Sequence, residues 1–419
     1  MKSFITTLLI FALSACACAA GSTTFLFYMC SDEAKQTSLE DATIRHMQGM
    51  TNAVTPPGVT ILCQSDRGQL KSAAQQAAYP DPDHRGGARY RISQGKWEYL
   101  EKMGEPNMGD PNVLLAFLKW GLATAPADRY VLVIVSHGSG TMSWRGPGAV
   151  GSRLPGEVQL SNFVAYDDTD NDCITLPELS AVLQKFKELR SGKALELLAL
   201  DACLPSTVEA FYQLRHGCDV MLGSSSEVFM GYFNHVNTLN ALSQNPNLTT
   251  EQLADVMVQG FIKNPSQSGN QIMSALRTSA ADELTGAMDR LAQEMIRATR
   301  AVGMPALGNV TCYELGEEKM YWDLKVICDR LLDPACNYKG AENAQAVRDA
   351  ARDVNKAIAA SWVSSWFMGQ FQTDKCGGIS LFWPDEKSYN GRRSFYKALD
   401  FARDTHWDEF IDLIRGQQN

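Results

Sequence analysis

Two residues that could act as a nucleophile and a general acid each follow an apolar segment. His137 comes directly after residues 130–136 (YVLVIVS), and Cys203 closely follows residues 195–200 (LELLAL). Apolar segments of this length are typical of buried central strands in a parallel sheet. Neighbouring strands lie ~4.8 Å apart, so both side chains would meet at the carboxyl edge of such a sheet, where substrates bind.

These residue types suit acyl transfer. A cysteine thiolate is a nucleophile, and a neighbouring imidazole lowers the pKa of the thiol and protonates the leaving amine. The backbone N–H groups of Gly138 and Cys203 could stabilise the oxyanion, because glycine lets the backbone approach closely. Each residue also has a structural alternative: a cysteine at a strand end is commonly an inert core thiol, and a histidine before a glycine often holds a turn.

Strands and helices alternate around these two residues. Strands are expected at residues 24–29, 59–63, 130–136, 195–200 and 220–223, and helices at 110–124, from 175, and at 207–215, 250–262 and 282–302. This order predicts a parallel α/β sheet covered on both faces. We expect a catalytic domain over residues 22–303, with long loops at 64–107 and 138–165. Residues 304–419, with a helix near 317–332 and a strand at 379–383, are expected to form a C-terminal subdomain packed on it.

Composition excludes several classes of protein. The chain has 419 residues, of which 45% are hydrophobic and 20% are charged, and its formal net charge is −9. This composition is typical of a globular protein and not of a disordered one. An acidic chain without a dense basic segment is unsuited to nucleic acid and to anionic membranes, so we expect neither as a partner. The sequence contains no C-x-x-C pair and no H-E-x-x-H, and therefore gives no support to a zinc site.

Residues 1–20 have the pattern of an export signal. Lys2 precedes an apolar stretch at residues 4–15, which is too short to span a membrane and fits the apolar part of a secretory signal. Residues 13–16 (LSAC) resemble a bacterial lipobox, in which Cys16 would be lipidated; cleavage after Ala20 is the alternative. We expect the protein in the bacterial cell envelope, the periplasm or the medium, attached to a membrane only through a lipid on Cys16.

Several short motifs occur in a fixed order along the chain. They are residues 104–111 (GEPNMGDP), 136–140 (SHGSG), 201–204 (DACL) and 377–384 (GGISLFWP). In this order they resemble the clostripain-like cysteine peptidases, which are relatives of caspases, legumains and gingipains. The resemblance extends from about residue 24 to residue 413. The chain departs from the family's pattern at Pro205, where methionine is common, and in the residues after Ser226-Glu227.

The resemblance implies a caspase-type α/β/α sandwich and a catalytic dyad of His137 and Cys203. It also implies cleavage of protein or peptide substrates after Arg or Lys, with Asp201 in the pocket for the P1 side chain. A carboxylate in a narrow pocket can pair with a guanidinium or ammonium group. The alternative for Asp201 is a strand-end residue that accepts hydrogen bonds from nearby backbone N–H groups.

Further roles follow from the same resemblance. Ser226 and Glu227 would line the substrate cleft. The protein would be a zymogen that matures by self-cleavage within residues 138–165, at Arg153 in preference to Arg145, because small and turn-forming residues flank both. The alternative is a surface loop with two solvated arginines.

No cofactor is required by this interpretation, although some members of the family use calcium. The candidate ligands are Asp167, Asp168, Asp170 and Asp172. Aligned with an EF-hand loop, Asp172 takes the place of the glycine at the sixth position. We therefore favour a polar turn followed by a capping box at Thr175–Glu178.

Three other functions remain alternatives. Residues 137–140 (HGSG) could be the oxyanion segment of a serine esterase, but the nearest match to its G-x-S-x-G elbow, residues 223–227 (GSSSE), ends in Glu. A non-catalytic surface lipoprotein could keep the fold, although the retained His137, Cys203 and Asp201 argue against it. A legumain-like peptidase that cuts after Asn would be less suited to an acidic pocket. We expect the protein to be a monomer.

Overall fold

The structure is a computed structural model. It describes residues 21–32, 38–68, 73–138, 163–228, 233–261, 271–305, 307, 310, 312–315, 318–335 and 338–416. The expected signal at residues 1–20 lies outside this part of the chain, as do Arg145 and Arg153. Among the described residues, none of the helices is both long enough and apolar enough to span a bilayer.

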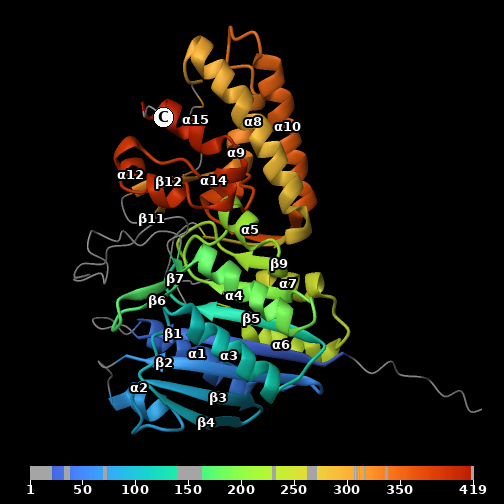
Figure 1. Cartoon of the computed structure of the whole chain (residues 1–419). Coiled ribbons are helices and arrows are strands. Elements are labelled where there is room, and N and C mark those ends of the chain that lie inside the picture. Colours follow the sequence, from blue (N-terminus) through green and yellow to red (C-terminus); the bar gives the residue numbers. More distant parts are fainter. Residues whose placement is uncertain are drawn as a thin grey trace, which may run out of the picture.

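A large central sheet organises the molecule (Figure 1). Its strand order is β13-β10-β9-β8-β5-β1-β2-β3-β4. The strands are β1 (Thr23–Ser31), β2 (Val59–Arg67), β3 (Gly87–Ser93), β4 (Lys96–Gly104), β5 (Arg129–Val135), β8 (Leu195–Asp201), β9 (Cys218–Gly223), β10 (Gln271–Arg277) and β13 (Trp362–Met368). The central strands β9, β8, β5, β1 and β2 run parallel, and antiparallel strands flank them on both sides.

Helices cover both faces of this sheet. Side chains of β5 alternate between the two cores: Tyr130, Leu132 and Ile134 pack on one side, and Val131, Val133 and Val135 on the other. The first core includes α3 (Pro111–Thr124), α4 (Leu176–Leu189) and α5 (Val208–Leu214); the second includes α1 (Ser38–Asn52), α6 (His235–Gln244) and α7 (Thr250–Gln259). The predicted α/β/α sandwich with a mostly parallel sheet is confirmed.

Two predicted helix starts are confirmed in detail. The Asp110 side chain caps α3 by accepting a hydrogen bond from the Asn112 N–H group, and Pro111 occupies the first turn. Thr175 and Glu178 form the predicted capping box at the start of α4. Since β7 (Asp172–Thr175) ends at this cap, the box also fixes the exit of the small hairpin that β7 forms with β6 (Phe163–Asp167).

The expectation of a long loop at residues 64–107 was wrong. Strand β2 continues to Arg67, α2 (Ala73–Ala78) follows, and β3 and β4 form a hairpin around Gly95, which has a φ of 68°. The hairpin carries ion pairs such as Arg89–Glu101 (2.9 Å) on one side and the buried Tyr90 on the other. Its many charged residues are those of an edge hairpin, and this composition led to the loop expectation.

The C-terminal third is joined to the sheet and does not stand apart from it. Helices α8 (Ala281–Val302) and α10 (Ala344–Ser361) pack together, and β13 then returns to pair with β10. The expected helix near 317–332 begins as a strand, β12 (Glu318–Asp323), and only its second half is helical, as α9 (Leu324–Leu332). The remaining elements are β11 (Cys312–Leu315), the 3-10 helix η1 (Thr278–Ala280), α11 (Gln370–Thr373), β14 (Ser380–Phe382), α12 (Glu386–Asn390), α13 (Arg393–Tyr396), α14 (Asp400–Asp404) and α15 (Trp407–Ile414).

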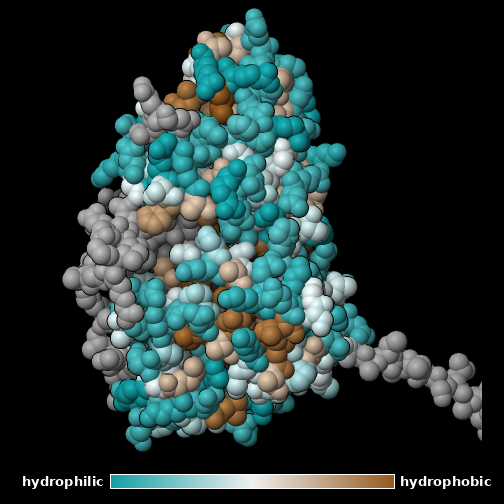
Figure 2. Space-filling model, in the orientation of Figure 1, coloured by the Kyte–Doolittle hydropathy of each residue, from teal (hydrophilic) through white to brown (hydrophobic). Residues whose placement is uncertain are grey.

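The polarity of the surface follows from the burial of apolar side chains in the two cores. Figure 2 shows one face on which hydrophobic residues lie in small groups among hydrophilic ones. Apolar side chains of the strands and helices are instead enclosed in the two cores. The face in view therefore has the polar exterior expected of an α/β sandwich.

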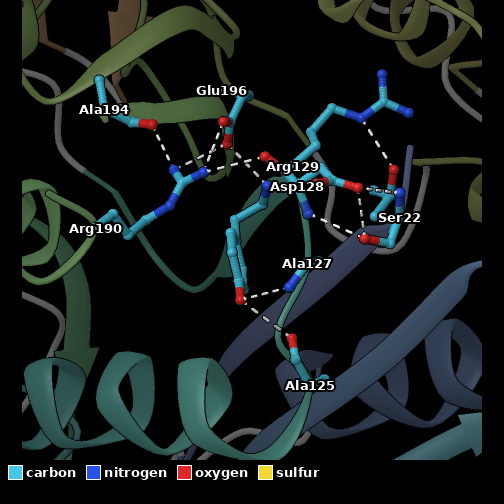
Figure 3. A network of polar contacts seen from close by, with 10 residues as sticks. Ser22, Ala125, Ala127, Asp128, Arg129, Arg190, Ala194 and Glu196 are labelled. Carbon is cyan, nitrogen blue, oxygen red and sulfur yellow. Dashed lines mark hydrogen bonds and ion pairs between the residues drawn. The ribbon is translucent and has the colours of Figure 1, made fainter. Parts of the chain in front are cut away.

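A polar network fastens the amino ends of the central strands (Figure 3). The Glu196 carboxylate accepts hydrogen bonds from the Tyr130 N–H group (2.8 Å) and from both terminal nitrogens of Arg190 (2.9 and 2.7 Å). The Asp128 carboxylate accepts one from the Ser22 N–H group (2.8 Å). The network links β1, β5 and β8 at the end of the sheet opposite to their carboxyl edge.

Replacing Glu196 should destabilise the protein without altering the carboxyl edge. In Glu196→Ala, the Arg190 side chain, which is only 5% exposed, loses its carboxylate partner. We expect the free energy of unfolding in urea to fall by about 3 kcal/mol, because a largely buried charge is left unpaired. Glu188→Ala, at an exposed position of α4, is the control and should change it by less than about 0.5 kcal/mol. Equal effects of the two variants would contradict this assignment.

Candidate active site

The pairing of β5 with β8 brings His137 and Cys203 to one edge. Val135 lies opposite Asp201, and the next residue, Ser136, donates its N–H group to the Asp201 carbonyl oxygen (3.3 Å). His137 and Cys203 then leave the two strands at the same level. The two chain segments are in close contact, since a Cβ placed on Gly138 would lie 2.7 Å from the Cys203 carbonyl oxygen. Their predicted proximity is thus reproduced by the fold.

Cys203 is the most accessible of the described cysteine side chains, because the others are buried. Its Sγ lies 3.4 Å from both the N–H group and the carbonyl oxygen of Val228. The next residue, Leu204, is buried yet has a φ of 62°, a left-handed conformation that non-glycine residues rarely adopt. The chain therefore turns sharply at the nucleophile candidate, and strain of this kind occurs at functional sites.

The segment after β9 supports this turn. The Ser226 carbonyl oxygen accepts a hydrogen bond from the Leu204 N–H group (3.2 Å), and the Ser224 carbonyl oxygen accepts one from the Ser206 N–H group (2.9 Å). Ser226 is buried, whereas Glu227 is exposed. Ser226 thus holds the backbone beside Cys203, and the predicted contact of Ser226 and Glu227 with substrate stays a prediction.

The surroundings of Cys203 favour a neutral thiol. Burial raises the pKa of the Cys203 thiol to about 12, and the negative charges of Glu227 and Asp201 raise it further. The Val228 N–H group acts in the opposite direction. At neutral pH the thiol is therefore protonated in this arrangement, and a nucleophilic role requires a base or a change in its surroundings.

Asp201 has a partner that the sequence did not reveal. Its carboxylate is fully buried, and Oδ2 lies 3.0 Å from Nε2 of His46 on α1. The His46 ring packs against that of His235 on α6, with ring centroids 4.7 Å apart. Oδ1 of Asp201 has no hydrogen-bond partner in the described part of the chain. The alternative of strand-end bonds to backbone N–H groups is not what this side chain shows, and its place in a P1 pocket stays a prediction.

The four calcium candidates do not form one cluster. Asp168 accepts a hydrogen bond from the Tyr166 hydroxyl group (3.1 Å), and Asp172 accepts one from the Asn107 side chain (2.7 Å). Asp170 donates its N–H group to Asp167 (3.0 Å). These contacts build the polar turn between β6 and β7. Only Asp167 is buried among other carboxylates, namely Asp32 and Asp66.

Sequence reasoning missed Asp32 and Asp66, although a signal was present. Both β1 and β2 are followed or ended by a Ser-Asp pair, Ser31-Asp32 and Ser65-Asp66. A polar pair repeated at the ends of two apolar strands indicates a shared location at one sheet edge. His46 had no comparable signal, because its partner Asp201 is 155 positions away in the chain.

Comparison with known proteins identifies the family of this chain. The model of the clostripain family matches residues 28–413. The chain belongs to the clostripain family. Clostripain from Hathewaya histolytica is 24% identical over 453 residues, an alignment that covers 94% of this chain and 80% of that protein. The chain is a cysteine endopeptidase, as expected of this family, and the serine-esterase alternative is set aside.

Solved structures of the family share the fold. One is a secreted C11 cysteine protease from Bacteroides thetaiotaomicron in complex with an irreversible peptide inhibitor, with a TM-score of 0.64, 17% identity, and coverage of 93% of this chain and 100% of that one. Another is an inactive zymogen C11 protease from Parabacteroides distasonis, with a TM-score of 0.63, 15% identity, and coverage of 91% and 97%. The predicted caspase-type α/β/α architecture of a clostripain-family peptidase is confirmed.

Gly138 should be required for activity of this clostripain-family enzyme. A Cβ at this position would lie 2.7 Å from the Cys203 carbonyl oxygen and 2.8 Å from Cβ of Ala202, so one of the two strand ends must move. We expect Gly138→Ala to lower kcat/KM by at least about tenfold, because small displacements of reacting groups slow catalysis strongly. The matched control is Gly286→Ala on α8, where the new Cβ would meet only the end of Arg290 at 3.8 Å. Equal kcat/KM for both variants would exclude a tight contact between Gly138 and Cys203.

The charge of Glu227 should be detectable at Cys203. Because the Glu227 carboxylate raises the pKa of the Cys203 thiol, Glu227→Gln should lower that pKa and increase the thiolate fraction. We expect alkylation of Cys203 by iodoacetamide at pH 8 to be about threefold faster, as measured by peptide mass spectrometry. Glu188→Gln should leave the rate unchanged. A slower reaction in Glu227→Gln would show that this carboxylate does not act on the thiol by its charge.

Proposed function

We propose that this enzyme is an exported endopeptidase that cleaves after Arg or Lys with His137 and Cys203 as a catalytic dyad. The observation that carries the proposal is the register of β5 and β8, which leads both residues out of the sheet at one level. Cys203 is also more accessible than the other described cysteine side chains. A pair of neighbouring cysteine and histidine residues at such an edge is sufficient for acyl transfer.

The proposed mechanism assigns roles to His137, Cys203 and Gly138. His137 removes the thiol proton, and Cys203 Sγ attacks the carbonyl carbon of the scissile bond. The N–H groups of Gly138 and Cys203 donate hydrogen bonds to the oxyanion. His137 then protonates the leaving amine, and water hydrolyses the thioester to release the acid and restore the thiol.

A positively charged P1 residue suits the electrostatics around Cys203. Asp201 and Glu227 both place negative charge near the thiol. A guanidinium or ammonium group bound beside them would offset these charges and thereby favour the thiolate. Asp201 is fully buried and paired with His46, so its carboxylate is not open to a substrate in this arrangement. This supports a latent form that self-cleavage at Arg153 or Arg145 activates.

The proposal also includes export of the enzyme from the cytoplasm. The signal-like residues 1–20 would direct the chain to the cell envelope, and Cys16 would carry the lipid if the lipobox is used. A secreted relative with the same fold is in agreement with this location. The partners are protein or peptide substrates with Arg or Lys at the cleavage site, and we propose that the enzyme acts as a monomer.

Fluorogenic peptides test the proposal directly. Matched peptides ending in Arg, Lys, Asn or Asp are offered to the chain that begins at Gly21 and to its Cys203→Ala variant. We expect turnover of the Arg and Lys peptides by the parent only, and at least about 100-fold slower cleavage of the Asn and Asp peptides, because an acidic pocket attracts a cation and repels an anion.

One further variant, Asp201→Asn, and the outcomes with Cys203→Ala separate the parts of the proposal. Asp201→Asn should reduce kcat/KM for Arg and Lys peptides much more than it changes the alkylation rate of Cys203 by a neutral reagent. Preference for Asn peptides would refute the Arg/Lys assignment while leaving the dyad intact. Wild-type activity in Cys203→Ala would refute the dyad, and inactivity of the parent on every peptide after cleavage within residues 138–165 would favour the non-catalytic lipoprotein.

A further inference from the structure

A buried histidine faces the carboxylate that lies two residues before Cys203. His46, on α1, is 4% exposed, and its Nε2 atom lies 3.0 Å from Oδ2 of the fully buried Asp201. Because a carboxylate only accepts hydrogen bonds, the Nε2–H group of His46 is the donor. The two residues are 155 positions apart in the chain, and the packing of α1 against the sheet brings them together.

Aromatic rings hold the His46 side chain in this position. Its ring packs against that of His235 on α6, with centroids 4.7 Å apart. The His235 ring in turn meets the Phe27 ring edge-on (4.8 Å) and lies nearly parallel to the Phe233 ring (6.0 Å). Burial lowers the pKa of His235 well below its usual value, and the charge of His46 acts in the same direction, so His235 is neutral. His235 therefore packs against His46 without competing for Asp201 as a cation.

The pairing of β5 with β8 fixes the Asp201 backbone, and His46 orients its side chain. Val135 lies opposite Asp201, and the Ser136 N–H group donates to the Asp201 carbonyl oxygen (3.3 Å). With the backbone held in this way, the carboxylate can only rotate about its side-chain bonds. The hydrogen bond from His46 to Oδ2 restricts this rotation, so the two oxygens of Asp201 are not equivalent.

The second oxygen of this carboxylate is not used in the same way. Oδ1 of Asp201 is buried and has no hydrogen-bond partner in the described part of the chain. A buried oxygen of this kind requires a donor, because leaving it unpaired costs free energy. His46 thus leaves Asp201 with a single oxygen that can accept hydrogen bonds from a ligand.

We propose that His46, acting through Asp201, makes the P1 pocket select Lys over Arg. The inference rests on the proposed function, in which Asp201 binds the P1 side chain in the activated enzyme. A guanidinium group binds a carboxylate best through two parallel N–H···O bonds, which need both oxygens. An ammonium group is a compact charge that one oxygen can satisfy. With Oδ2 engaged by His46, an Arg side chain loses its second bond, whereas a Lys side chain keeps its contact.

Two fluorogenic peptides that differ only in Lys or Arg at P1 test this inference. The active enzyme should cleave the Lys peptide with a kcat/KM at least about threefold higher than that of the Arg peptide. The variant His46→Leu removes the donor and frees Oδ2 for a second N–H group. We therefore expect the Lys/Arg ratio of kcat/KM to fall by at least about tenfold, mainly through a lower KM for the Arg peptide. A purely structural role of His46 would lower both values together and leave their ratio unchanged.

Matched controls separate the hydrogen bond from packing. The side chain in His46→Gln is similar in size to that in His46→Leu but keeps an N–H donor, so it should restore the Lys/Arg ratio of the parent. His235→Phe keeps a ring beside His46 and should also retain the ratio. Thermal unfolding in the Cys203→Ala background checks that each variant folds. If His46→Leu does not fold, His46→Met takes its place as a second variant without a donor.

The outcomes distinguish this inference from the proposed function. A parent enzyme that prefers Arg, or a Lys/Arg ratio that is unchanged without the donor, overturns the role of His46 while cleavage after Arg or Lys stands. Loss of the Lys preference in His235→Phe as large as that in His46→Leu also overturns it. A parent enzyme that cleaves neither peptide overturns the proposed function and this inference together.

Discussion

The parallel pairing of β5 with β8 is the constraint on which the site depends. Apart from Arg129, Glu196 and Asp201 near their ends, both strands are apolar and buried on both faces. Neither can slip by one residue without reversing every side chain between the two cores. This register fixes the level at which His137 and Cys203 leave the sheet. The close contact of Gly138 with the Cys203 backbone then follows, because no side chain separates the two segments. The relative placement of His137 and Cys203 is thus a consequence of strand packing.

The carboxyl edge of the sheet concentrates negative charge in a buried environment. Asp201 forms a hydrogen bond with His46, whereas Asp32, Asp66 and Asp167 have no side-chain partner of this kind in the described part of the chain. Burial, together with the negative charges of Glu227 and Asp201, raises the pKa of the Cys203 thiol and keeps it neutral. Positive charge brought by a substrate or an ion would therefore have a large effect here, because buried charges are weakly screened.

The sequence predicted the elements that bury apolar residues on both faces. The segments that form β5 and β8 are mostly apolar, so the strands, their neighbours and the residues at their ends could be placed. The β3–β4 hairpin was missed because its charged residues pair across the strands, as Arg89 and Glu101 do, and resemble those of a loop. The pairing of Asp201 with His46 could not be foreseen, because it depends on how α1 packs against β8. Polar side chains that pair across a large distance in the chain leave no local pattern in the sequence.

The contact of α5 with β14 and α13 has a consequence for the order in which the protein is assembled. The Glu209 carboxylate, on the helix that follows Cys203, accepts hydrogen bonds from the Phe382 N–H group (3.0 Å) and the Tyr396 hydroxyl group (3.0 Å). Both donors are more than 170 positions further along the chain. A chain that is still being synthesised can already contain His137 and Cys203 but not Phe382 and Tyr396, which hold the helix that follows Cys203. The helix after Cys203 therefore gains its full set of contacts only after nearly all of the chain has been made.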